Sequence, residues 1–118
     1  MDTQAITINE YHNDGSFINL YYNESIGEWC VYGFSLYRLW IFCKSNGHDT
    51  LQSFSKEMQM PCLIITKNTF TLLLQNMTDI TEQIDSHVRI RMSEKTAMDA
   101  YRAWVKTLKG KIPEVYKL

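Results

Sequence analysis

The feature that most constrains this chain is a change of hydrophobic period close to Ser93. In residues 87–92, polar and apolar side chains alternate strictly, which is the pattern of a β-strand with one buried face. After Ser93, apolar residues recur every three or four positions, as in a helix with one buried face, and Gly110 and Pro113 mark its end. The apolar stripe of this helix consists of Ala97, Ala100, Tyr101, Trp104, Val105 and Leu108. A chain that carries both periods side by side has to combine helices with a sheet.

The N-terminal quarter predicts a meander of three antiparallel strands. Residues 6–22 alternate on both sides of the turn signal Asn13-Asp14-Gly15. A three-residue loop with its glycine in the left-handed conformation pairs Ile8 with Leu20 and gathers the apolar side chains on one face. That face consists of Ile6, Ile8, Ile18, Leu20 and Tyr22. A second turn leads into the third predicted strand, residues 28–32.

The next predicted element is a helix over residues 35–45, with Ser35 as its N-terminal cap. Its apolar stripe consists of Leu36, Leu39, Trp40 and Cys43. Tyr37, Ile41 and Phe42 make the remaining sides apolar as well. A helix that is apolar all round either lies centrally in its domain or gives one face to a partner.

The middle of the chain predicts two more helices and a strand. Asp49 and Gln52 resemble a capping box for a short helix that ends at Pro61. This helix would carry Leu51, Phe54 and Met58. Residues 62–66 are typical of a buried strand. Residues 68–77 have helical spacing, although the first half of this segment also alternates like a strand, and we favour the helix.

Length and composition restrict these elements to one domain. The chain has 118 residues, of which 45% are hydrophobic and 13% aromatic, enough for a single core and too many for a disordered chain. We therefore expect one α+β domain over residues 1–118. It would have a mainly antiparallel sheet, made of the N-terminal meander and later strands, packed with three or four helices.

The sequence also bears on where the protein works. The first residues do not resemble a signal peptide, and the longest apolar stretch, residues 29–43, is shorter than the ~20 residues that a spanning helix needs. The three cysteines, Cys30, Cys43 and Cys62, lack the spacing of a disulfide framework or a metal site. We expect a cytoplasmic protein with reduced thiols and no contact with a membrane.

Signals for catalysis, metals and cofactors are weak. Cys62 is the best candidate nucleophile, with His48 or His87 as its base, but no known nucleophile signature surrounds it. The histidines and carboxylates do not have the spacing of a metal site, and no glycine-rich phosphate loop is present. We expect no metal and no cofactor, and we keep an enzyme with a Cys62 nucleophile as a second alternative.

A first alternative is a nucleic-acid-binding domain. If residues 87–92 form a strand, then His87, Arg89 and Arg91 lie on one face as a cationic stripe. Residues 61–118 hold 9 Lys+Arg and 6 Asp+Glu, whereas residues 1–60 hold 3 and 7. The net charge of -1 opposes attraction to a polyanion, so we favour the simpler interpretation of a solvated strand face.

Surplus aromatic and apolar residues favour protein binding. Tyr11 and Tyr21 fall outside the predicted core positions, as do Tyr37, Ile41 and Phe42 on the helix over residues 35–45. Exposed residues of these types mark protein interfaces. We therefore expect a small binding or accessory module without catalysis, which binds a protein partner or forms a homo-oligomer.

Overall fold

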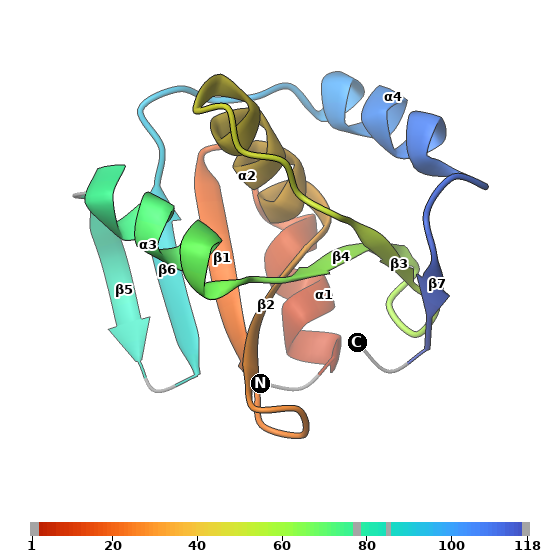
Figure 1. The fold of residues 1–118 in the computed structure, drawn as a ribbon, viewed down its shortest axis with the longest axis horizontal. Helices are drawn as coiled ribbons and strands as arrows, with labels where there is room; N and C mark the ends of the chain where they lie inside the picture. The colour runs from red at the N-terminus through yellow and green to blue at the C-terminus, as the bar shows by residue number, and fades with distance from the viewer. Residues whose placement is uncertain (1–2, 77–78, 85, 117–118) are drawn as a thin grey trace.

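The computed structural model describes residues 3–76, 79–84 and 86–116. Within these residues, the chain forms four helices and one seven-stranded sheet (Figure 1). The helices are α1 (Thr3–Tyr11), α2 (Gly33–Ser45), α3 (Lys67–Asn76) and α4 (Met98–Leu108). The strands are β1 (Phe17–Asn23), β2 (Glu28–Tyr32), β3 (Ser53–Ser55), β4 (Met60–Ile64), β5 (Ile80–Ile84), β6 (His87–Arg91) and β7 (Glu114–Val115). The predicted α+β fold is confirmed.

The sheet is antiparallel except at one edge. Its strand order is β5-β6-β1-β2-β4-β3-β7, and only β3 and β7 run parallel. Strand β1 lies inside the sheet and pairs with β2 on one side and with β6 on the other, where Ile18 lies opposite Ile90 and Leu20 opposite Val88. None of the helices in the described part of the chain is long and apolar enough to cross a membrane.

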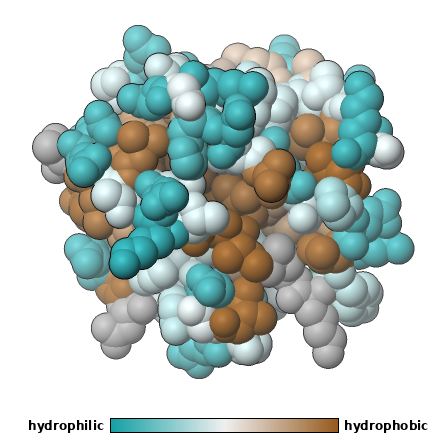
Figure 2. All heavy atoms as spheres, in the orientation of Figure 1, coloured by the Kyte–Doolittle hydropathy of each residue, from teal (hydrophilic) through white to brown (hydrophobic). Residues whose placement is uncertain are grey.

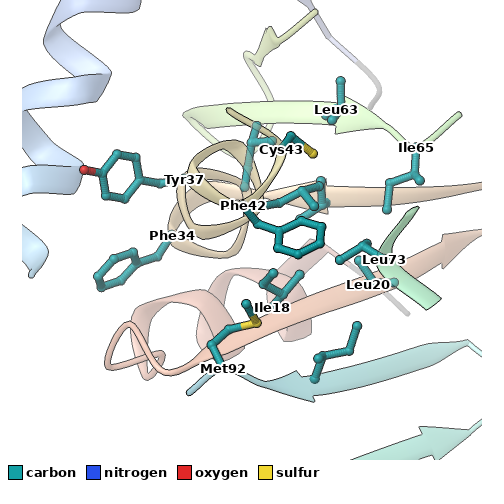
Figure 3. Close-up of a cluster of buried hydrophobic side chains, with 14 of the residues drawn as sticks. Ile18, Leu20, Phe34, Tyr37, Phe42, Cys43, Leu63, Ile65, Leu73 and Met92 are labelled. Carbon is teal, nitrogen blue, oxygen red and sulfur yellow. The ribbon is translucent and has the colours of Figure 1, made fainter. Parts of the chain in front are cut away.

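Alternation along the strands divides the sheet into two faces. The α2 face carries the main core, with strand residues Ile18, Leu20, Val31, Leu63, Val88 and Ile90 beneath α2 and α3. The α1 face carries a smaller cluster, with Tyr21, Cys30, Tyr32 and Cys62 packed together with Ile6 of α1. Figure 3 shows the main core, where Phe42 of α2 and Leu73 of α3 lie beside Ile18 and Leu20 of β1.

Aromatic rings join α2 to α4. The ring centroid of Trp104 lies 5.2 Å from that of Tyr37 and 5.4 Å from that of Trp40. Phe34 stacks on Tyr101, with 5.1 Å between centroids. Helix α2 therefore has the sheet on one side and α4 on the other, which explains why its sequence is apolar all round. Of the two interpretations of this helix, the central position is correct.

The first strand of the predicted meander is wrong, because residues 3–11 form helix α1. Ile6 and Glu10, four residues apart, share the buried side of this helix, while Ile8 is half exposed. The place beside β1 that Ile8 was expected to fill belongs to β6, with Val88 opposite Leu20. The alternation of residues 6–11 therefore fits a helix as well as a strand. The hairpin of β1 and β2 and the left-handed Gly15 are confirmed.

Three further parts of the secondary structure differ from the prediction. The helix expected after Asp49 is absent, because residues 53–55 form β3 and pair with β4. Residues 80–84, for which no helix or strand was predicted, form β5. The last helix begins at Met98 with Ala97 as its cap, rather than at Ser93. The helix predicted over residues 68–77 is confirmed as α3, whose described bounds are Lys67–Asn76.

Candidate functional site

Most of the predicted aromatic surface is buried. The side chains of Tyr21, Tyr37 and Phe42 have 1%, 9% and 9% of their area exposed, so their assignment to the surface is wrong. Ile41 is partly buried against the main core, and Tyr11 is 82% exposed at the end of α1. These five residues do not form one surface, because Tyr21 belongs to the α1 face while Tyr37 contacts α4.

The predicted cationic stripe is only partly exposed. His87, Arg89 and Arg91 share one strand face, as the alternation predicts, but His87 is buried and its Nε2 lies 3.0 Å from Asn19 Oδ1. Burial lowers the pKa of His87, which favours its neutral form. The guanidinium groups of Arg89 and Arg91 lie 3.8 and 5.1 Å from the ring centroid of Phe17. All three residues of the stripe are therefore either neutral or in contact with an aromatic ring.

Cys62 lies in an environment that disfavours nucleophilic chemistry. Its side chain is fully buried on the α1 face, where burial and the neighbouring Cys30 raise the pKa of its thiol to about 12. All three cysteines are free thiols. Within the described ranges, no three metal-binding side chains come together to hold an ion. The geometry of Cys62 therefore does not favour the enzyme alternative.

The most elaborate polar cluster centres on Glu10, a residue that sequence reasoning did not single out. Its carboxyl oxygens accept hydrogen bonds from the Tyr21 hydroxyl at 2.7 Å, from the Ser35 hydroxyl and backbone N–H at 2.9 Å, and from Asn19 Nδ2 at 3.2 Å. Ser35 lies in the first turn of α2, where backbone N–H groups lack helical partners. Glu10 thus caps α2 from another helix, the role that the sequence assigned to Ser35.

Burial is the dominant electrostatic influence on this cluster. Glu10 is only 4% exposed, and desolvation raises the pKa of its carboxyl group despite the hydrogen bonds, which lower it. Burial and the charge of Glu10 raise the pKa of Tyr101 to about 12. The hydroxyl and amide groups surround both oxygens of Glu10, so the cluster holds α1 against the sheet. Glu10 also lines a pocket of about 460 Å³ between α1 and α4.

An apolar groove, the α3–β5 groove, lies between helix α3 and strand β5. It consists of Leu74 on α3, Ile80 on β5 and the pocket between them. This pocket of about 140 Å³ is lined by Leu20, Phe70, Leu73, Leu74, Ile80, Gln83, Val88 and Ile90. Figure 2 shows hydrophobic atoms at the left of the molecule, over α3 and β5. The groove therefore opens the main core to the surface at one edge of the sheet.

Strand β5 is the edge of the sheet next to this groove. All of its residues are exposed, and among the described residues no strand pairs with its outer side. The sequence Ile-Thr-Glu-Gln-Ile contains neither proline nor lysine, two residues that protect edge strands, although a bulge lies between Ile80 and Glu82. Sequence reasoning missed this site because three successive polar residues in β5 are typical of a loop.

The comparisons with known proteins add no functional assignment. No protein-family model matches the chain, and neither a curated protein nor a solved structure matches it.

Proposed function

We propose that the protein is a binding module without catalysis that takes up an extended segment of a protein partner at the β5 edge. The observation that carries this proposal is the combination of an exposed edge strand with an apolar pocket beside it. An added strand would satisfy the outward N–H and C=O groups of β5, and its side chains would determine specificity. The partner segment would be β-prone, with apolar residues at alternate positions.

The pocket of the groove can hold one apolar side chain of the partner as an anchor. Leu74 is 50% exposed and Ile80 is 38% exposed. An apolar side chain that enters the pocket would cover the exposed area of both residues and would itself be buried, which favours binding. The floor of the pocket consists of core residues such as Leu73 and Ile90, which are fully buried and hold its shape. A preformed apolar pocket of this kind suits binding without rearrangement.

The same edge accommodates a second copy of the chain, so self-association is part of the proposal. We further propose that the protein is cytoplasmic, where its three buried thiols would stay reduced. The aromatic residues first considered for the interface are not needed, since α4 and the sheet already cover most of them.

A displayed library of random peptides tests this function without knowledge of the natural partner. We expect the selected peptides to alternate apolar and polar residues, and we expect their binding to be lost in Leu74→Lys and in Ile80→Lys. Leu51→Lys is the matched control, because Leu51 is 90% exposed and lies outside the residues that line the groove. Peptides that bind the Leu74 and Ile80 variants as tightly as the natural protein would refute the proposed site.

Sedimentation of the same proteins measures self-association through this edge. If the natural chain forms dimers at high micromolar concentration, the Leu74 and Ile80 variants should be monomers while Leu51→Lys remains dimeric. Dimers that survive both groove substitutions would show that another surface joins the copies.

A further inference from the structure

Helix α1 is attached to the rest of the molecule by few buried side chains. Of its described residues only Ile6 and Glu10 are buried, whereas nine residues of α2 are buried. Ile8 and Tyr11 are 49% and 82% exposed, so the opposite side of α1 contributes little apolar burial. The buried attachment of α1 consists of the Glu10 carboxyl group and the Ile6 side chain, and a hydrogen bond between the side chains of Asn9 and Tyr21 adds to it.

The surface beneath α1 is separate from the main core. It consists of Tyr21, Cys30, Tyr32, Met58 and Cys62, and it packs against Ile6. The main core lies on the other face of the sheet and contains no residue of α1. Helix α1 can therefore leave without removing any side chain from the packing that holds α2 and α3 to the sheet.

One flank of α1 is also open. A pocket of about 460 Å³ separates it from α4, with Thr7, Glu10 and Tyr11 on one side and Met98, Tyr101 and Arg102 on the other. Along this flank α1 borders the pocket. Segments with little apolar burial open most readily in native proteins.

The connection after α1 provides a fixed pivot. The Asn13 side chain donates hydrogen bonds to the Phe17 carbonyl at 3.0 Å and to the Ser35 hydroxyl at 3.1 Å, while its Oδ1 accepts one from the Gly15 N–H at 3.0 Å. Asn13 Nδ2 also lies 3.5 Å from Glu10 Oε1, but its bonds to the Phe17 carbonyl and the Gly15 N–H do not involve Glu10. A helix that lifts away would turn about this point.

We propose that α1 is a displaceable cover of the α1 face, held closed by the Glu10 side chain. Its opening exposes Tyr21 and Tyr32 together with the Cys30 and Cys62 thiols. The hydroxyl and amide groups that bind Glu10 would then be hydrated, while β5 and the main core keep their structure. This device is independent of the β5 edge and of what binds there.

The three cysteines make the opening measurable, because they lie on different faces. Cys30 and Cys62 lie in the cluster beneath α1, whereas Cys43 belongs to the main core beneath α2. Labelling of the native chain with iodoacetamide, followed by mass spectrometry of each cysteine, therefore distinguishes opening of α1 from unfolding of the whole domain. Rates are compared with those of the same cysteines in the urea-unfolded chain.

In Glu10→Ala, the donors around the lost carboxyl group have no acceptor while α1 stays closed, which shifts the equilibrium toward the open state. We expect labelling of Cys30 and Cys62 to accelerate by about tenfold or more, with the rate of Cys43 unchanged. Ile6→Ala should act in the same direction if Glu10→Ala does not fold. Ile8→Ala is the matched control on the exposed side of α1 and should leave all three rates unchanged.

Two results would overturn the proposal. If all three cysteines accelerate together in Glu10→Ala and in Ile6→Ala, then α1 cannot open without unfolding of the domain. If neither Cys30 nor Cys62 accelerates in either variant, then the Glu10 side chain does not hold the helix closed.

Discussion

The Glu10 side chain couples folding to pH. Its ordinary pKa is 4.5, and burial raises that value in the folded state. A raised pKa means that the folded state favours the protonated carboxyl group. The contribution of Glu10 to stability is therefore greatest below pH 4.5 and is lost as the pH rises through the raised folded-state pKa.

Glu10→Gln tests this coupling. The groups around Glu10 that could titrate or carry charge are Tyr21 and His87 on the sheet, Tyr101 on α4, and Arg89 and Arg102 nearby. Both proteins share these groups, so we expect the free energy of unfolding to fall more steeply with rising pH in the natural chain than in the variant. Urea unfolding between pH 4 and pH 8 measures both slopes, and equal slopes would contradict the account.

Gly15 shows how much a single turn residue contributes to the free energy of unfolding. Its φ of +91° is in the left-handed region, and an added Cβ would lie 2.1 Å from the Thr96 carbonyl oxygen. We expect Gly15→Ala to lower the free energy of unfolding by at least about 2 kcal/mol. Gly47→Ala is the control, because Gly47 is also left-handed but faces open space, and should lose about 1 kcal/mol. Equal losses of unfolding free energy in the two variants would show that the close approach of Gly15 to Thr96 does not affect stability.

At the scale of the element, the pairing of α2 with α4 depends on Trp104. This is the one residue of α4 that is fully within the core, and it contacts both Tyr37 and Trp40. We expect Trp104→Ala to cost about 3–5 kcal/mol in urea unfolding. Lys106→Ala, on the exposed side of α4, should change stability by less than about 0.5 kcal/mol. A small effect at Trp104 would mean that α4 is not essential to the core.

The elements predicted correctly from the sequence include those long enough to show a clear hydrophobic period, either the alternation of a strand or the three-to-four-residue spacing of a helix. Strand β6 alternates, and α2 and α3 have helical spacing over ten residues or more. The failures have local physical causes. Residues 6–11 put Ile6 and Glu10 on one side of a helix, and a buried glutamate is not visible as a core residue in a sequence. Strand β5 has three polar residues between two isoleucines, and all five are exposed, so its sequence does not show the alternation of a half-buried strand.

The interpretation of surface residues failed for a related reason. Tyr21 and Tyr37 looked like surplus aromatic residues because each lies beside a residue already assigned to the core. Tyr21 is buried because α1 covers the second face of the sheet, and Tyr37 is buried because α4 covers the far side of α2. Both contacts join segments distant in the sequence, so alternation and helical spacing do not reveal them.

At the scale of the whole molecule, charge argues against general binding of nucleic acid. The net charge is -1, His87 is buried, and Arg89 and Arg91 lie beside Phe17. We expect no measurable binding of a single-stranded or double-stranded oligonucleotide near physiological salt. Submicromolar binding that weakens steeply with salt and is lost in a variant with Arg89→Ala and Arg91→Ala would favour the nucleic-acid alternative instead.

The central claim is that a partner adds a strand to β5. The most direct measurement is an isotope-filtered NMR experiment on the labelled protein with an unlabelled peptide from the selected library. If the peptide adds a strand, we expect nuclear Overhauser contacts between the peptide backbone and the backbone of residues 80–84, together with contacts from one apolar peptide side chain to Leu74. Contacts confined to other surfaces, with β5 unchanged, would contradict the central claim.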